Sequence, residues 1–395
     1  MSVQFGGRGA RSCSRLFVIL SLLLVSRAWA SGIGEQRILV IMARFPDVTP
    51  SFSVDAARTK YFDRLDRYVR AISQGKARVV GKATDWYTLP RDVGHYRISQ
   101  HNLGVERDRI AALIQDSIDL VDRDEDFSRY SAVVISLGAR RRDFGMMGLC
   151  GYPGMLGWRS GTAFRTHGKG QSVPGGVAIF CEEAHVGVVF HDLAHIMGGV
   201  RQGRRVVPCL YDHDLQAQSG PFRGYARFYL VNVGFFDPMS CHFFALRAPP
   251  PGVCAWTKHR LGWLDPRNVV QVPRGQSVTL RLWPLSQHSE GAQVARVPVG
   301  DGTYYLIENR QPIGPDLNLP SHGLLIYLCD DRVAECRHGK SPITLVDSSP
   351  SVAELRSAPF TANGPATYTD QARRVTVRVL AQEGAAVRIA VSNGK

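Results

Sequence analysis

The sequence has no long low-complexity tract, no internal repeat and, after residue 30, no apolar run long enough to cross a membrane. These absences argue against a disordered chain, a repeat protein and an integral membrane protein. No nucleic-acid-binding module accompanies the basic residues, so we expect no nucleic-acid partner. The remaining features, 44% hydrophobic and 21% charged residues in a chain of 395, are those of a globular protein that can bury one or two cores.

The first 30 residues have the pattern of a secretory signal. Three arginines precede the apolar run 16–25, and a small-x-small cleavage site ends at Ala30. A membrane anchor is the alternative, but the run is short for a bilayer and Arg27 interrupts it. We expect a secreted or periplasmic protein whose mature chain starts near Ser31, without a stable membrane span.

The mature chain is basic. Removing the four arginines of the signal from the formal charge of +14 leaves +10. Apart from "ARRRD" at 139–143 and "RQGRR" at 201–205, the Lys and Arg residues are scattered, which is typical of a solvated surface. Attraction to anionic cell surfaces or to acidic substrates stays open.

The number of cysteines is odd once the signal is removed. Seven of the eight cysteines lie after it, and an exported protein meets an oxidising compartment in which disulfides form. Cys329 and Cys336 bracket the short polar loop in "CDDRVAEC" and are the expected pair. The other pairings cannot be read from the sequence, and one thiol must be left over.

The first part of the mature chain alternates strand-like and helix-like segments. Buried strands are predicted at 37–45, 132–138 and 176–180, and amphipathic helices at 61–72 and 110–121. Such alternation indicates a mixed α/β domain, which we place at 31–267.

From residue 268 onward the pattern is that of strands alone. Apolar residues alternate with polar ones at 278–282, 375–379 and 387–391, and Gly384 marks a turn between the last two segments. Period-two alternation without a helical stretch predicts a β-rich C-terminal domain at 268–395, a sandwich or a jelly-roll.

The stretch 185–199, "HVGVVFHDLAHIMGG", places two histidines four residues apart on a predicted helix. Residues i and i+4 share one helix face, so His191 and His195 can present ring nitrogens to a common metal ion. A catalytic zinc ion also needs a third protein ligand and an open position for water. The alternative is a pair of hydrogen-bonded histidines on a buried helix. Only the surrounding sequence can distinguish a metal site from such a structural pair.

Segments on both sides of the two histidines form a recognisable series. They are "ILVIMARFPD" (38–47), "SQGKARVVGKATDWYTLP" (73–90), "PCLYDHD" (208–214), "FFDPMSC" (235–241) and "AWTKHRLGWLDP" (255–266). In this order the series resembles the secreted metallopeptidases of the immune inhibitor A family, a metzincin-like group. The resemblance implies a zincin-like α+β catalytic domain, a zinc cofactor and protein or peptide substrates. It also implies that Met239 lies in a turn under the metal.

Two positions depart from the family pattern. Asp192 stands where the family has a glutamate that acts as general base, and its side chain is shorter by one methylene, roughly 1.5 Å. The apparent insertion "VRQGRRVV" at 200–207 displaces the third ligand, for which Cys209 and Asp212 rank equally and Asp214 comes next. Cys209 has a competing interpretation as half of a disulfide. The propeptide that the family carries has no counterpart before the first predicted strand.

We therefore expect an exported zinc endopeptidase in which His191, His195 and a third group near 209–214 hold the metal, with Asp192 as base. The second hypothesis is a catalytically impaired homologue that acts as an extracellular binding or adhesion protein through its β-rich domain. A third is that no metal binds and the histidines are structural. The aspartate and the altered ligand stretch leave the choice between the first two to experiment.

Overall fold

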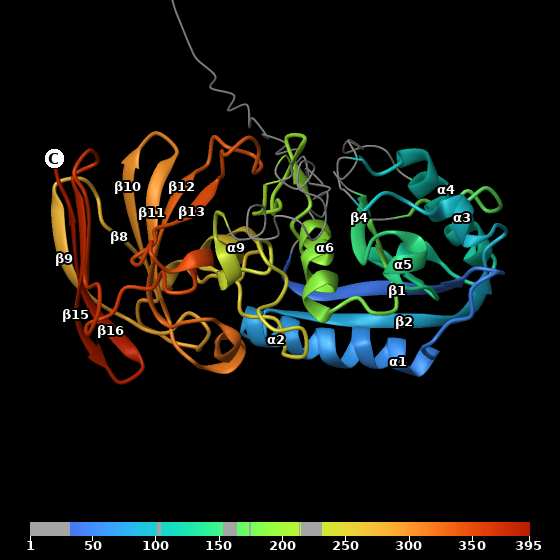
Figure 1. The fold of residues 1–395 in the computed structure, drawn as a ribbon, viewed down its shortest axis with the longest axis horizontal. Helices are drawn as coiled ribbons and strands as arrows, with labels where there is room; N and C mark the ends of the chain where they lie inside the picture. The colour runs from blue at the N-terminus through green and yellow to red at the C-terminus, as the bar shows by residue number, and fades with distance from the viewer. Residues whose placement is uncertain (1–31, 101–103, 153–163, 174, 213, 215–230) are drawn as a thin grey trace, which may run out of the picture.

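The protein is described by a computed structural model that covers residues 32–100, 104–152, 164–173, 175–212, 214 and 231–395. The predicted signal at 1–30 lies outside these residues. Figure 1 shows the molecule with its longest axis horizontal. A sheet and helices from the first part of the chain lie at one end, and the C-terminal sheets lie at the other. The helices α6 (Val186–Gly198) and α9 (Ala255–Arg260) lie between the two ends.

The first part of the chain contains a mixed five-stranded sheet in the order β2-β1-β3-β5-β4. Its strands are β1 (Gly34–Arg44), β2 (Ala77–Thr88), β3 (Ala132–Leu137), β4 (Gly148–Tyr152) and β5 (Val177–Phe180). All neighbouring pairs are parallel except β4 and β5. The antiparallel strand β4 therefore forms one edge of the sheet.

Short and medium helices connect these strands. They are α1 (Val54–Arg58), the π-helical segment η1 (Thr59–Leu65), α2 (Asp66–Ser73), α3 (Val93–Tyr96), α4 (Arg107–Val121) and α5 (Arg141–Phe144), with a 3₁₀ turn η3 (Phe127–Arg129). In α4 the buried positions Ile110, Leu113, Ile114, Ser117, Ile118 and Val121 recur with helical spacing. The predicted helix at 61–72 is confirmed, with its first half π-helical.

Two largely antiparallel sheets make up the C-terminal part. One has the order β13-β12-β11-β10-β8, with β8 (Val269–Gln271), β10 (Val294–Gly300), β11 (Thr303–Arg310), β12 (Gly323–Asp330) and β13 (Ile343–Leu345). The other has the order β14-β15-β16-β9, with β9 (Gln276–Leu282), β14 (Thr367–Asp370), β15 (Val375–Glu383) and β16 (Ala386–Asn393). The remaining elements are the hairpin strands β6 (Val200–Arg201) and β7 (Arg204–Arg205) and the 3₁₀ turns η5 (Gly234–Phe236), η6 (Pro266–Asn268), η7 (Gly314–Asn318) and η8 (Ala353–Leu355).

The buried side chains form two hydrophobic clusters, which lie on opposite faces of the sheet that contains β11. Tyr304 and Leu306 on one face of β11 belong to the larger cluster, which also contains the residues of α6. Tyr305 and Ile307 on the other face belong to the smaller cluster, formed with β15 and β16. Because side chains alternate between the two faces of a strand, one sheet can bury both. The larger core thus extends across residue 267, where we placed the domain boundary.

The expected disulfide between Cys329 and Cys336 does not form in the structure. All seven cysteines after residue 30 are free thiols and all are buried. Cys329 lies within β12, in register with Ile343 of β13, and its side chain packs in the larger core. The Sγ of Cys336 lies 3.2 Å from the hydroxyl of Ser341 in the loop after β12. The two sulfurs therefore lie in different surroundings, that of Cys329 in the core at β12 and that of Cys336 in the loop after it.

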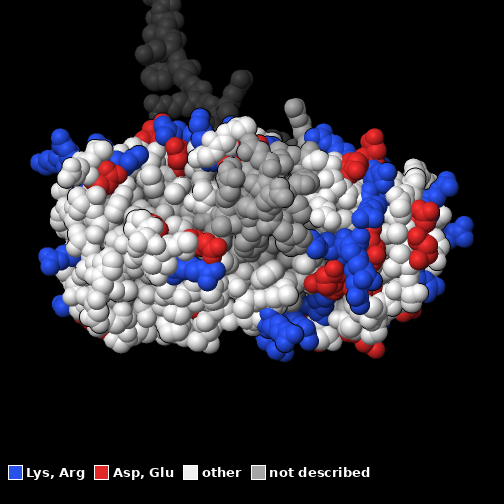
Figure 2. All heavy atoms as spheres, viewed as in Figure 1, with Lys and Arg blue, Asp and Glu red and all other residues white. Residues whose placement is uncertain are grey.

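The surface agrees with the expectation of scattered charge. Figure 2 shows one face of the molecule, on which Lys and Arg side chains lie beside Asp and Glu side chains in several places. Within the described ranges, no helix has the length and apolar character needed to span a membrane.

Candidate metal centre

The helix α6 carries the two histidines, and its ends are fixed by specific contacts. At its start, Nδ1 of His185 accepts a hydrogen bond from the backbone N–H of Gly187 at 3.0 Å. At its end, Gly199 has φ of 66° and donates its N–H to the carbonyls of His195 and Ile196, as glycine does where a helix stops. Nearly all of α6 is buried, because apolar residues surround it on every side.

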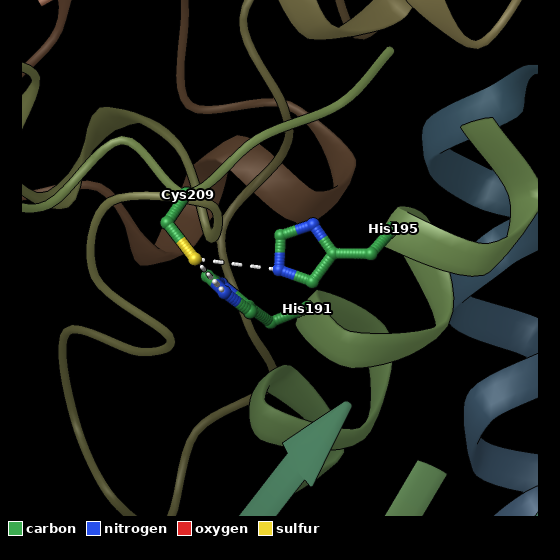
Figure 3. A group of neighbouring side chains, drawn as sticks. All are labelled: His191, His195 and Cys209. Atoms are coloured by element: carbon green, nitrogen blue, oxygen red, sulfur yellow. Dashed lines mark hydrogen bonds between the residues drawn. The ribbon is translucent and has the colours of Figure 1, made fainter. Parts of the chain in front are cut away.

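His191, His195 and Cys209 come together at the buried side of α6 (Figure 3). The Sγ of Cys209 lies 3.4 Å from Nε2 of His191 and 3.4 Å from Nε2 of His195. None of the three residues is more than 2% exposed. The group could hold a metal ion, and Cys209 supplies the third ligand atom from the segment that follows the β6–β7 hairpin.

Backbone carbonyls fix the orientation of both imidazole rings. Nδ1 of His191 lies 2.9 Å from the carbonyl oxygen of Pro238, and Nδ1 of His195 lies 2.6 Å from that of Val207. A carbonyl oxygen only accepts, so each Nδ1 carries the hydrogen and each Nε2 keeps its lone pair. Both lone pairs therefore belong to the nitrogens that approach Cys209. Metal-ligating histidines typically donate the N–H of their other ring nitrogen to an acceptor in this way.

Burial sets the protonation of the group before any metal binds. It lowers the pKa of His191 to about 4, so this ring is neutral at neutral pH. It also raises the pKa of the Cys209 thiol to about 12, while the Arg205 guanidinium and a hydrogen bond from Tyr211 act in the opposite direction. A metal ion that bound here would displace the thiol proton, since coordination deprotonates cysteine.

Arg205 and Tyr211 line the Cys209 side of the group. Nη1 of Arg205 lies 3.9 Å from Sγ of Cys209, and the Tyr211 ring stacks on His191 with 5.6 Å between ring centroids. Both residues are at most 6% exposed. A fixed positive charge and a hydroxyl donor beside the sulfur favour the thiolate that a metal ligand requires.

Asp192 is buried next to the sheet edge. Its carboxylate accepts a hydrogen bond from the backbone N–H of Cys150, in β4. Burial raises the pKa of Asp192 to about 8, against the opposing charge of Arg205. The negative charge of Asp192 contributes to the raised pKa of Cys209, so the carboxylate lies within electrostatic reach of the group.

Two glycines let other segments approach α6 closely. A Cβ on Gly187 would lie 1.9 Å from the carbonyl oxygen of His242, and one on Gly198 would lie 2.7 Å from the Val207 side chain. The first approach brings the segment 235–242 against the helix, and the second brings the segment between β7 and Cys209. These glycines permit the contacts that orient the histidines.

Met239 lies in a buried turn that contacts α6 through His191. Its side chain is fully buried, and the preceding residue supplies the carbonyl that orients His191. The Asp237 carboxylate holds the turn by accepting from the N–H groups of Met239 at 2.7 Å and Cys254 at 2.9 Å. Arg310 of β11 adds a further contact, because its Nη1 donates to the carbonyl of Phe236 at 3.2 Å.

The structure separates Asp212 and Asp214 from the group of three. The Asp212 carboxylate accepts from the N–H groups of Asp214 and Gly339, each at 2.9 Å. The Asp214 carboxylate pairs with Arg337 at 2.9 Å and accepts from the N–H of His338 at 2.8 Å. Both acids thus anchor the loop after β12, and of the two residues that the sequence ranked equally only Cys209 lies in the group that could hold a metal ion.

Several residues around the group were not predicted. His242 lies edge-on to His191 with 4.6 Å between ring centroids, and Glu335, in the loop after β12, interacts electrostatically with Arg205 and Cys209. His242 follows the "DPMSC" turn directly, so its position beside Met239 was a usable signal. Glu335 has no such signal, because only the fold brings its loop to the metal centre.

A scan against protein-family models finds no match for the chain, and a search of curated proteins finds none either.

Proposed function

We propose that the protein is an exported zinc-dependent endopeptidase of the immune inhibitor A type, with a zincin-like catalytic domain and a C-terminal sandwich or jelly-roll domain. The observation that carries the proposal is the group of exactly three candidate ligands, His191, His195 and Cys209, found among the described residues. Catalytic zinc sites have three protein ligands and leave a position for water, whereas structural sites have four. Two ligands from the motif helix and a third from the segment after the β6–β7 hairpin therefore support catalysis.

The donor set fits zinc. Zinc bonds to sulfur at about 2.3 Å and to nitrogen at about 2.0–2.1 Å, so two such ligands at a tetrahedral angle lie about 3.6 Å apart. The two observed separations between sulfur and nitrogen are 3.4 Å. Two neutral imidazoles and one thiolate also match the preference of zinc for nitrogen and sulfur ligands. Zinc in such a site polarises carbonyl groups and lowers the pKa of water toward neutrality.

The chain supplies the groups that peptide hydrolysis needs around the metal. Asp192 follows His191 on α6 and, when ionised above its raised pKa of about 8, can accept a proton and return it to the leaving amine. The same carboxylate contacts β4 through the N–H of Cys150. We propose that an extended peptide substrate lies beside α6 along β4, which is an edge strand of the described sheet.

The second candidate is an impaired homologue that keeps the metal and acts as a binding protein. Its supporting observation is that the Asp192 side chain, already shorter than that of glutamate, accepts a hydrogen bond from the backbone of β4. A base displaced by about 1 Å can lose on the order of 100-fold in rate. In that case the C-terminal sheets would provide the recognition surface.

Metal analysis combined with casein hydrolysis separates the candidates. The proteins to compare are the wild type, Asp192→Asn, Asp192→Glu and the matched control Asp63→Asn, which changes an exposed aspartate away from the site. The enzyme predicts about one zinc ion per chain and chelator-sensitive cleavage that falls at least about 100-fold in Asp192→Asn but not in the control. Bound zinc without cleavage by the wild type supports the binding protein. A purified protein that takes up no zinc contradicts both candidates.

A further inference from the structure

A cavity of about 740 Å³ lies beside the candidate metal centre and shares Arg205 with it, although none of the three candidate ligands lines the cavity. It is lined by the β6–β7 hairpin, by α9 and by residues of β8, β10 and β11, with Asp331 just after β12. The hairpin turns through Gln202 and Gly203, both with positive φ, and so presents the basic run 201–205 to the cavity. This run belongs to the apparent insertion 200–207, in which Arg205 also contacts the metal centre whereas Arg201 and Arg204 are exposed.

The lining of the cavity is strongly basic. Its described side chains include five arginines, namely Arg201, Arg204, Arg205, Arg260 and Arg296, against the single acid Asp331. Four positive charges are therefore in excess. Guanidinium groups gathered around a partly enclosed space attract anions, because low-dielectric walls strengthen the field there.

Two of the arginines are held in place by aromatic rings. The guanidinium carbon of Arg260 lies 3.8 Å from the centre of the Trp256 ring, and that of Arg296 lies 4.0 Å from the centre of the Tyr304 ring. Stacking uses the flat face of a guanidinium and leaves its N–H edges for hydrogen bonds. Arg260 already donates two of them, to the carbonyl of Val206 at 2.9 Å and to Asp331 at 3.2 Å. These arginines are thus already ordered for an anionic ligand.

The positive charge in the cavity is only partly neutralised. Asp331 pairs with Arg260 at 3.2 Å, but Arg204 and Arg296 form no ion pair with an acid in the described part of the chain. Nε of Arg205 is buried and has no hydrogen-bond partner there. Burial lowers the pKa of the neighbouring His259, and the charges of Arg260 and Arg296 lower it further. An anion would supply the missing acceptors.

We propose that this cavity binds an organic ligand that carries sulfate or phosphate ester groups. Such groups offer three tetrahedrally arranged acceptor oxygens, which suits guanidinium groups that converge from a hairpin, a helix and a strand better than the two oxygens of a carboxylate do. The volume is that of a small-molecule site rather than of a lone ion. Leu264, Val269 and Leu306 give the cavity an apolar wall for the carbon skeleton. The site does not depend on the proposed peptidase activity.

Titration calorimetry with the purified full chain tests the proposal. The probes are sucrose octasulfate and inositol hexakisphosphate, with sucrose as the neutral control and inorganic phosphate as the lone ion. Binding of either ester, without binding of sucrose, supports the proposal and shows which ester the cavity prefers. Inorganic phosphate should bind more weakly than the ester, because it fills only part of the cavity. If neither ester binds at low salt, the proposal is wrong.

Variants separate the cavity from general attraction between a basic protein and a polyanion. Arg296→Gln and Arg204→Gln each remove one cavity charge, and Arg378→Gln removes one exposed charge on β15. A charge-assisted hydrogen bond predicts that each cavity variant weakens ester binding about 10-fold and that Arg378→Gln does not. Arg204 is exposed in a hairpin, so this variant should fold even if Arg296→Gln does not. Equal affinities of Arg204→Gln and Arg378→Gln would overturn the assignment.

Discussion

Nδ1 of His191 lies 2.9 Å from the carbonyl oxygen of Pro238, so the turn that contains Met239 determines how this histidine faces Cys209. The turn is itself held by Asp237 and by Arg310 of β11. The orientation of one ligand thus depends on contacts that reach into the C-terminal sheets. The predictions below test this chain of contacts and the site it supports.

Removal of the thiol should abolish tight zinc binding. Loss of an outer hydrogen bond to a ligand typically costs 10–100-fold in affinity, so we expect Cys209→Ala, which removes a ligand, to cost more than about 100-fold. Competition with a chromophoric chelator measures the affinity. The control is Cys329→Ala, which removes another buried thiol, within β12, and should leave affinity near wild type. Equal losses in both variants would mean that Cys209 acts only through folding.

Gly187→Ala should disturb the turn and the metal centre together. The added methyl would lie 1.9 Å from the carbonyl oxygen of His242, which is backbone and cannot rotate away. Overpacking of this kind typically costs 1–3 kcal/mol of stability, measurable by denaturant unfolding, and zinc affinity should fall as well. At Gly94 the new methyl would meet only an ordinary contact at 3.5 Å. A Gly187→Ala protein as stable as Gly94→Ala would show that the turn is not tightly seated on α6.

Arg310→Met should strongly destabilise the fold. The Arg310 side chain is fully buried, donates to both oxygens of Asp316 at 2.7 and 2.6 Å, and pairs with Glu308 at 3.0 Å. Its removal leaves buried carboxylates unpaired, which costs about 3–5 kcal/mol. The comparison is Arg388→Met, which breaks a half-exposed pair with Glu383 and should cost about 0–1 kcal/mol. Similar unfolding free energies for the two variants would contradict a structural role of the buried network.

Acid should loosen the contact between the two C-terminal sheets at Asp370. Hydrogen bonds from Tyr305 and Arg373 lower the pKa of Asp370 to about 2. Since the folded pKa lies below the ordinary value, this carboxylate stabilises the fold above about pH 4 and loses that effect as the pH falls toward about 2. Unfolding midpoints of Asp370→Asn and wild type should therefore differ at neutral pH and converge in acid. A constant difference across that range would show that Asp370 does not titrate as described.

Much of the fold could be read from hydrophobic periodicity. Strands β1, β3, β5, β9, β15 and β16 and the helix α4 lie where alternation or helical spacing placed them. Strand β2 was not predicted, because its sequence breaks the period at Gly81. There a Cβ would lie 1.9 Å from the carbonyl oxygen of Ile38, so the close pairing of β1 and β2 requires glycine. Periodicity carries no signal for such a constraint.

The candidate site was predictable only where its residues share a motif. Spacing alone placed His191 and His195 on one helix face, whereas the choice between Cys209 and Asp212 depended on how the inserted hairpin folds. The structure shows the Asp212 carboxylate accepting from the backbone N–H of Asp214, two residues on, and from that of the distant Gly339, and local sequence does not encode the second contact. Glu335 and the arginine-lined cavity were unpredictable for the same reason.

Zinc K-edge X-ray absorption of the zinc-loaded protein tests the central claim most directly, because it reports the ligand atoms themselves. The account predicts one sulfur at about 2.3 Å and nitrogen or oxygen ligands at about 2.0–2.1 Å, with the sulfur lost in Cys209→Ser. A spectrum of the wild type without sulfur, or one that Cys209→Ser leaves unchanged, would contradict the assignment of His191, His195 and Cys209 as the metal centre.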